Sequence, residues 1–362
     1  MNVKEDVMRY PRRTLVVASI AAAGLALTGC VGGGGGAPDE QTLTVTMWGG
    51  AAQEGHVATV VQPWADENGV TVQQDSPTDY AKLDAMVDAG KVSWGVVETE
   101  PNYTDTACKA GTLTKLSDEV KQAAEEAEVD PAFMSDCGIP ILQYAFTIGY
   151  NTEKFADGHP TTWEEFFDTE KFPGKRGFWK YATGGIFEAA LLADGVAPED
   201  LYPLDLDRAF AKLDTIKDDI VWYDTGDQQT QLVASGEAPL VQAWNGRITQ
   251  AAADGQPVAN EFGENLTTYE HVVIPQGYPN TELAEDWMVW FLSNPEAQAD
   301  QAIETGYGPA SPRALEFVPA EVQAELAGSE AVDSQAAATM DYGYWAENYG
   351  DVTERFNVWM AQ

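Results

Sequence analysis

Two short segments in the second half of the chain place a cation, a carboxylate and two aromatic rings close together in sequence. In the first, Trp244 comes three positions before Arg247, and in the second, Tyr269 comes directly before Glu270. An arginine can bind a carboxylate through two hydrogen bonds, a glutamate can bind an ammonium group, and an aromatic face attracts cations. Taken alone, the same residues are also compatible with a core tryptophan and a surface ion pair.

Both segments lie next to stretches that are typical of β-strands. Residues 239–243 form an apolar run that ends at Trp244, and residues 272–274 form a β-branched run that is closed by Pro275. In α/β proteins, ligands bind in crevices beyond the ends of strands. We therefore expect Trp244, Arg247, Tyr269 and Glu270 to line a ligand cleft.

The N-terminal part of the chain alternates strands with helices. This alternation favours a parallel sheet with helices on both faces. Trp48, Gly49 and Glu100 stand at the ends of expected strands, and so they join the candidate site. The elements expected along the whole chain are strands at 43–48, 70–73, 94–98, 145–152 and 178–181, and helices at 54–68, 80–89, 163–167, 186–193, 206–216, 228–235, 283–292 and 295–304, with a helical acidic tail from 319 onward.

Composition limits the possible partners. The chain has 362 residues, enough for two ordinary domains, and a hydrophobic content of 44%, enough for a packed core. Its 58 acidic and 20 basic residues give a formal net charge of -38, which excludes nucleic acid because a polyanion would be repelled. The acidic charge could favour a cationic ligand, or it could serve only solubility or a salty habitat. It does not indicate where a binding site lies.

The N-terminus has the features of a bacterial lipoprotein leader. Three arginines within the first 13 residues precede an apolar stretch, 14–27, that is too short to span a membrane. The sequence Leu-Thr-Gly-Cys that ends at Cys30 matches a lipobox. We expect residues 1–29 to be a signal peptide, 30–40 a glycine-rich tether, and Cys30 the lipidated residue that anchors the protein outside the cytoplasmic membrane. The alternative is a secretory signal with a chance cysteine.

Two cysteines remain after Cys30. Outside the cytoplasm, an even number of cysteines favours a disulfide between Cys108 and Cys137. Closing a loop of about 30 residues stabilises a protein by roughly 3–4 kcal/mol in the chain-entropy account. The three histidines are isolated in the sequence. No metal site and no cofactor are therefore expected.

Short motifs in a fixed order along the mature chain carry a family resemblance. They are Met47-Trp48, residues 109–113, residues 149–152, Trp163 with 172–175, residues 235–237 with 244–246, and Gly306-Tyr307 with Pro309. Their order and spacing behind a lipobox resemble the type II periplasmic binding proteins. The closest branch is that of the spermidine/putrescine-binding proteins of ABC importers, with their GABA-binding relatives.

The resemblance implies a two-lobed α/β fold. Each lobe would be a mixed sheet flanked by helices, and the ligand cleft would lie between the lobes. Lobe one would comprise residues 41–146 and 271–362, and lobe two residues 147–270, with the C-terminal helices assigned to either lobe. Ligand capture would be a hinge closure at two crossovers, near 145–150 and 269–275.

The resemblance also assigns roles to single residues. In polyamine binders, aromatic walls cover the methylene chain and acids hold the ammonium groups. Trp48 and Trp244 match two such walls, and Glu270 matches an acid that grips an amine. Glu100 and Tyr181 are further candidate ligand residues.

This chain departs from the polyamine pattern at two places. The acid pair expected before the lobe-two helix is replaced by Ala182 and Gly185, and Arg247 is an added cation. One amine anchor is kept, one is lost and a carboxylate-binding group is gained. The resemblance to the GABA-type branch therefore implies a zwitterionic ligand, with Glu270 and Arg247 at its two ends.

The expected function is that of a monomeric substrate-binding lipoprotein of an ABC importer. It would capture a small linear amine or ω-amino acid and deliver it to the permease subunits. A sugar or another small solute, stacked on the tryptophans, is an alternative within the same fold. A secreted hydrolase that uses Glu98 and Glu100 is a less favoured alternative, because the sequence has no Gly-x-Ser-x-Gly motif and no metal-spaced histidines.

Overall fold

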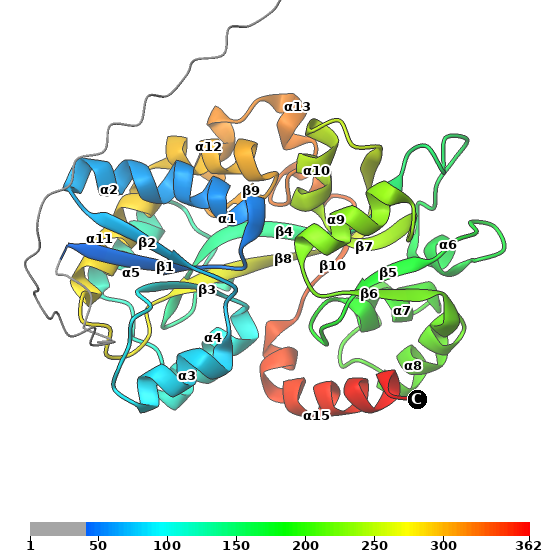
Figure 1. Ribbon diagram of the computed structural model, residues 1–362, viewed down its shortest axis with the longest axis horizontal. Helices are drawn as coiled ribbons and strands as arrows, with labels where there is room; N and C mark the ends of the chain where they lie inside the picture. Colours follow the sequence, from blue (N-terminus) through cyan, green and yellow to red (C-terminus); the bar gives the residue numbers. More distant parts are fainter. Residues whose placement is uncertain (1–40) are drawn as a thin grey trace, which may run out of the picture. The chain divides into compact units, whose positions relative to one another are not determined.

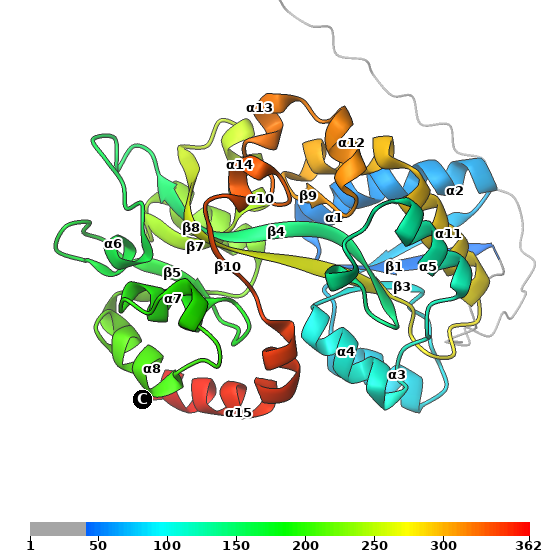
Figure 2. The same cartoon turned by 180° about the vertical axis from the view of Figure 1, so that it is seen from behind.

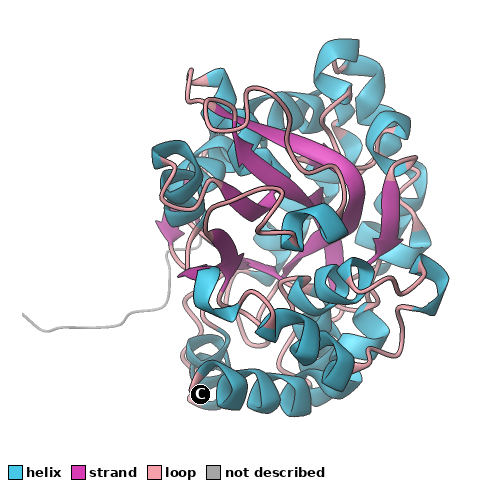
Figure 3. Cartoon of the chain, turned by 90° about the vertical axis from the view of Figure 1, so that its right-hand side faces the viewer, coloured by secondary structure: helices cyan, strands magenta, loops and turns pink. Residues whose placement is uncertain are grey.

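Ten strands form one mixed sheet in residues 41–362, the part of the chain that the computed structural model describes (Figure 1). The expected signal peptide, the tether and Cys30 lie outside these residues. Within 41–362, no helix is both long and apolar enough to cross a membrane. Figure 3 shows the strands enclosed by helices, the arrangement that the alternating pattern of strands and helices predicts.

The strands follow one order across the sheet, and two further short strands pair with its central members. The order is β2 (Thr71–Asp75), β1 (Thr42–Thr46), β3 (Val96–Thr99), β8 (Val258–Val273), β4 (Gly138–Asn151), β7 (Leu240–Trp244), β5 (Arg176–Trp179) and β6 (Ile220–Tyr223), with β9 (Gly308–Pro309) on β4 and β10 (Ala336–Thr339) on β8.

Two long antiparallel strands, β4 and β8, connect the sides of the sheet. On one side, β1 pairs in parallel with β2 and β3, and on the other, β5 pairs in parallel with β6 and β7. We call these sides the β1–β3 half and the β5–β7 half. The β4–β8 pairing runs from Gly138 opposite Val273 to Asn151 opposite Val258, and its register shifts between Phe146 and Ile148. This shift falls within the expected crossover at 145–150, while the lobe boundaries themselves stay a prediction.

Helices cover both halves of the sheet (Figure 1). With the β1–β3 half lie α1 (Gly50–His56), a π-helical turn (Val57–Val61), α2 (Gln62–Asn68), α3 (Tyr80–Asp88), α4 (Pro101–Ala110), α5 (Asp118–Glu126), α11 (Thr281–Ser293) and α12 (Pro295–Thr305). With the β5–β7 half lie α6 (Trp163–Phe167), α7 (Ile186–Ala193), α8 (Leu206–Asp214), α9 (Gly226–Ser235) and α10 (Asn245–Ala253).

The remaining helical segments are short, except for the last one. They are four 3₁₀ turns (Pro131–Phe133, Pro198–Asp200, Lys217–Asp219 and Pro312–Phe317), α13 (Ala320–Gln323), α14 (Glu330–Asp333) and α15 (Tyr342–Met360).

Local signals explain several helix ends. Gly69 ends α2 with a φ of 67°, a left-handed conformation that glycine adopts without strain. Thr225 caps α9, because its side chain accepts a hydrogen bond from the backbone N–H of Gln228. The helix expected at 54–68 begins earlier, at Gly50, and contains the π-helical turn, for which the sequence shows no local signal.

The C-terminal helix α15 contacts both halves of the sheet (Figures 1 and 2). It packs on α4 of the β1–β3 half. Trp345, within α15, donates from Nε1 to Oε1 of Glu188 on α7 at 3.0 Å, and the ring of Phe356 lies 5.7 Å from that of Phe187. A segment far along the sequence therefore connects the halves in addition to β4 and β8.

A disulfide joins Cys108 on α4 to Cys137, directly before β4, with the two Cα atoms 5.8 Å apart. Both residues belong to the β1–β3 half, near the expected crossover strand. The bond ties the helix that follows β3 to one of the two connecting strands.

Candidate ligand-binding site

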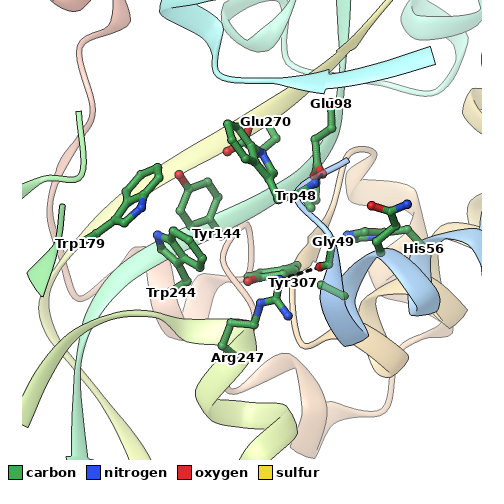
Figure 4. A pocket seen from close by; sticks show the side chains of 13 residues that line it. Trp48, Gly49, His56, Glu98, Tyr144, Trp179, Trp244, Arg247, Glu270 and Tyr307 are labelled. Carbon is green, nitrogen blue, oxygen red and sulfur yellow. Dashed lines mark hydrogen bonds between the residues drawn. The ribbon is translucent and has the colours of Figure 1, made fainter. Parts of the chain in front are cut away.

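A pocket lies between the two halves of the sheet (Figure 4). The cavity that the lining side chains leave is small, with a volume of about 40 Å³. Its walls come from the ends of strands in both halves and from the connecting strands. The lining residues are Trp48, Gly49, Ala52, Gln53, His56, Glu98, Leu142, Tyr144, Trp179, Trp244, Arg247, Glu270 and Tyr307.

Five of the eight ligand residues expected from the sequence line this pocket. Trp48 and Gly49 follow β1, Trp244 ends β7, Arg247 lies in the first turn of α10, and Glu270 lies in β8. These positions are the strand and helix ends at which an α/β fold places ligand groups.

The other three expected residues lie outside the pocket lining. Glu100 is fully buried behind it, at the start of α4. The ring of Tyr181 stacks on Trp179 with a centroid distance of 4.7 Å. Tyr269 packs against Phe133, with ring centroids 4.5 Å apart. Tyr269 and Glu270 are neighbours in β8, and adjacent residues of a strand point to opposite faces.

Two carboxylates form one end of the pocket. Glu98 lies opposite Val272 in the β3–β8 pairing, two residues from Glu270, so both acids lie on one face of the sheet. The backbone N–H of Trp48 donates to Glu98 Oε2 at 3.3 Å. Glu270 Oε2 is buried and has no hydrogen-bond partner of good geometry among the described residues. This end of the pocket can therefore accept a further hydrogen bond from a ligand.

Burial disfavours the ionised form of both carboxylates. It raises the pKa of Glu98 to about 7, against smaller lowering effects from the Trp48 N–H and Arg247. It raises the pKa of Glu270 well above its usual range, and repulsion from Glu98 and Glu100 raises it further. The Trp48 and Tyr144 side chains lie near enough to Glu270 to offset part of this increase. A cation placed between Glu98 and Glu270 would relieve the repulsion and favour the ionised form.

Arg247 forms the opposite end of the pocket, as Figure 4 shows. Its Nη2 donates to the backbone carbonyl of Gly49 at 3.0 Å, and its Nη1 lies 3.6 Å from Asp227 Oδ1. The Arg247 side chain is 7% exposed, whereas that of Asp227 is 75% exposed. Arg247 Nε is buried without a partner among the described residues. The guanidinium can therefore accept a further anionic partner.

His56 also lines the pocket, but as a neutral group. Burial, followed by the charge of Arg247, lowers its pKa to about 3. Its Nδ1 lies 2.7 Å from the side-chain nitrogen of Gln301. Among the described lining residues, Arg247 is therefore the one that carries a positive charge at neutral pH.

Aromatic side chains fill the space between the two ends. Trp244 and Trp179 pack edge to face with a centroid distance of 4.8 Å, and Figure 4 shows Tyr144 between Trp244 and Glu270. The indole nitrogens of Trp48 and Trp244 are buried without hydrogen-bond partners among the described residues. Apolar walls with a few polar groups at each end suit a short hydrocarbon chain with charged termini.

Two polar contacts position the start of α10. Asn245 Oδ1 accepts the N–H of Ala145 at 2.9 Å, and its Nδ2 donates to the Gly306 carbonyl at 3.1 Å. Gly246 faces Tyr307 so closely that a Cβ atom there would lie 2.5 Å from the ring. The absence of a side chain at 246 therefore sets the position of Tyr307 in the pocket wall.

Several residues that line the pocket were not among the ligand residues expected from the sequence. Tyr144 lies in β4 two residues after Leu142, which pairs with Glu270, so the strand register would have indicated it. Glu98 was considered only for the hydrolase alternative. Tyr307 and His56 reach the pocket through the packing of α12 on α1, which no local pattern predicts.

Comparisons with known proteins find relatives that match most of this chain. The chain is 34% identical over 328 residues to the gamma-aminobutyric acid-binding protein of Pseudomonas aeruginosa, covering 89% of this chain and 92% of that one. A solved structure, the Atu4243-GABA receptor, is 39% identical, covers 89% of this chain and 98% of that one, and superposes with a TM-score of 0.79.

Two further solved structures differ in whether they hold a ligand. The binding protein MotA of Agrobacterium tumefaciens B6, in complex with glucopine, is 26% identical and covers 88% of this chain and 99% of that one, with a TM-score of 0.81. AttC of A. tumefaciens C58, in an open unliganded conformation, is 28% identical over the same shares but has a TM-score of 0.67. At similar identity, this structure is more like the complex than the open form.

The expected two-lobed α/β fold is confirmed by these structural neighbours. A family model described as bacterial extracellular solute-binding protein matches residues 59–328, most of the chain. Its description places the protein outside the cytoplasm and makes it a binding protein, not an enzyme. The chain belongs to the family of bacterial extracellular solute-binding proteins.

Proposed function

We propose that this protein is the substrate-binding component of an ABC importer, and that it captures a small ω-amino acid such as GABA. The lipobox that ends at Cys30 supports a lipid anchor at the outer face of the cytoplasmic membrane. A Cys30→Ser variant should then lose its partition into membranes, and unchanged partition would contradict the anchor.

One observation supports this class of ligand: the same small pocket has a buried carboxylate oxygen without a partner among the described residues at one end and a buried guanidinium at the other. The ligand ammonium would lie against Glu270 and Glu98, and the ligand carboxylate against Arg247. The methylene chain would lie between Trp244 and Trp48. Charge-assisted contacts in a partly dry pocket are stronger than their equivalents in water.

A diamine or polyamine is the competing ligand class, because the sequence also resembles polyamine binders. Such a ligand would place a second cation near Arg247, which costs free energy through repulsion. The similarity to a GABA-binding protein and to a GABA receptor supports the amino-acid proposal.

Replacing Arg247 separates the two ligand classes. We would titrate the parent protein and Arg247→Gln with GABA, putrescine and spermidine by calorimetry. GABA should bind the parent, and Arg247→Gln should lose about 2–5 kcal/mol of GABA binding, the usual effect of truncating one partner of a buried charge pair.

Arg208→Gln is the matched control, because Arg208 lies in the same half of the sheet and pairs with Asp194 at the surface. It should bind GABA like the parent. Putrescine affinity that persists in Arg247→Gln, together with no amino-acid binding by the parent, would replace this proposal with the polyamine one.

A further inference from the structure

Glu100 contacts the opposite half of the sheet directly. It lies between β3 and α4 in the β1–β3 half, whereas Thr183 lies in the turn between β5 and α7 in the β5–β7 half. Thr183 Oγ1 donates to Glu100 Oε1 at 2.7 Å, and both residues are fully buried. A short hydrogen bond between two buried residues of different halves exists only when the halves are close together.

The second carboxylate oxygen of Glu100 is also occupied. Tyr80 OH lies 3.5 Å from Glu100 Oε2 and accepts the backbone N–H of Glu100 at 3.0 Å. Tyr80 belongs to α3, in the same half as Glu100. Glu100 thus differs from Glu270, whose Oε2 is unpaired and which lines the pocket.

We infer that Glu100 and Thr183 form a clasp that holds the two halves closed over the pocket, and that Glu100 is a positioning residue instead of an ammonium ligand. The clasp requires no particular ligand, so the inference goes beyond the proposed function. It replaces the role in ligand binding that the sequence suggested for Glu100.

A second contact between the halves involves a residue of the pocket wall. Arg247 Nη2, in the β5–β7 half, donates to the carbonyl of Gly49, in the β1–β3 half. Arg247, however, also faces the pocket, whereas Thr183 and Glu100 do not line it. The clasp can therefore be removed without removing a pocket residue.

The surroundings of Glu100 support a hydrogen-bonded, ionisable clasp. Burial raises the pKa of Glu100 to about 7, while hydrogen bonding from Thr183, Tyr181 and Tyr80 opposes that increase. Tyr349 of α15 donates to the hydroxyl of Tyr181 at 3.0 Å. Helix α15, which packs on both halves, thus helps to hold the Tyr181 hydroxyl that faces Glu100.

Two substitutions separate a clasp from a ligand contact. Thr183→Val removes the hydroxyl and keeps the charge of Glu100, whereas Glu100→Gln removes the charge and keeps an acceptor for Thr183. Thr183→Ser should restore the hydrogen bond. Thr59→Val is the control, because Thr59 is half-buried and its hydroxyl donates to the Gly55 carbonyl one turn earlier, with neither residue in the pocket lining.

We would measure the radius of gyration of each full-chain variant by small-angle X-ray scattering, with and without GABA. GABA dissociation would be followed by stopped-flow tryptophan fluorescence. Thr183→Val should shift the protein towards a larger radius and release GABA about ten-fold faster, the effect of losing a hydrogen bond to a charged group. Glu100→Gln, Thr183→Ser and Thr59→Val should stay close to the parent.

A Thr183→Val variant with the parent's radius and dissociation rate would overturn the clasp. So would a Glu100→Gln variant that loses GABA as completely as Glu270→Gln. If the parent fails to bind GABA, the proposed function fails, and the scattering comparison without ligand still decides the clasp. In that case, a larger radius for Thr183→Val than for Thr59→Val supports the clasp, and equal radii overturn it.

Discussion

The two ends of the pocket differ in how far other groups of the protein pair with their charged side chains. At the acidic end, Glu270 and Glu98 are buried close together, and one oxygen of Glu270 has no partner among the described residues. At the other end, Arg247 already donates to the Gly49 carbonyl and lies near Asp227. The acidic end lacks a cation, whereas the arginine end is partly occupied by the protein itself.

This difference assigns separate roles to the two ends. A ligand ammonium would supply the charge that the acidic end lacks, so this end should contribute most of the binding free energy. A ligand carboxylate must share Arg247 with acceptors already present, so that end should contribute less free energy and more discrimination between amino acids and diamines.

The largest expected effect is that of Glu270→Gln. The variant keeps the size of the side chain but removes the charge that faces the ammonium, so GABA binding should weaken by about 2–5 kcal/mol. Calorimetric titration measures this loss. It should be at least as large as the loss in Arg247→Gln if the acidic end dominates.

Glu188→Gln is the matched control for a buried carboxylate. Glu188 is fully buried on α7 and accepts a hydrogen bond from Tyr202 at 2.6 Å, away from the pocket lining. Normal GABA affinity in Glu270→Gln, or an equal loss in Glu188→Gln, would contradict the role of the acidic end.

The second expected effect is a pH dependence that arises at the acidic end. Because burial raises the pKa of Glu98 to about 7 and raises that of Glu270 well above the usual glutamate range, the folded protein holds protons there that the unfolded chain would release. The stability that these groups contribute is therefore present at low pH and is lost as the pH rises from the usual glutamate range through about 7.

GABA should reverse this loss, because its ammonium stabilises the ionised carboxylates and stays protonated below a pKa of about 10. Affinity should consequently rise about ten-fold between pH ~5.5 and ~7.5, since one unit of pKa shift corresponds to roughly 1.4 kcal/mol. Calorimetry and the ligand-induced change in Tm at both pH values test this. A constant Kd would show that the acidic end does not exchange protons on binding.

The smallest expected effect is that of Asp227→Asn at the arginine end. Asp227 is mostly exposed, and its contact with Arg247 is long, so removing its charge should free the guanidinium and tighten GABA binding by at most about 1 kcal/mol. Asp224→Asn, an exposed acid just before α9, is the control. Weaker binding in Asp227→Asn alone would mean that Asp227 orients Arg247 instead of competing for it.

Local sequence patterns predicted most elements of the fold but not the extent of its connecting strands. The strand expected at 272–274 is the end of β8, which begins at Val258, and the strand expected at 145–152 is the second half of β4. Their missed portions include polar residues such as Asn260 and Glu261. These residues are half-buried within strands, where β4 supplies pairing partners that come from far along the chain.

The candidate site was predictable where it depends on strand ends. Trp48, Trp244 and Arg247 follow or end strands, so their approach to one pocket follows from the fold class. Tyr269 could have been separated from Glu270, because a period of two residues puts neighbours in a strand on opposite faces. The role of Glu100 depends on Thr183, which comes from the other half of the sheet, and no local pattern contains that information.

The close approach of Gly246 to Tyr307 has a consequence for how the ligand range of this scaffold can change. A methyl group at 246 cannot be accommodated without moving the Tyr307 ring, which stands in the pocket wall beside His56. One additional carbon atom, on a residue that does not itself line the cavity, would thus reshape the cavity wall beside Arg247, the cation that Tyr307 faces. The shape of this wall can therefore change while every lining residue, Arg247 included, keeps its identity.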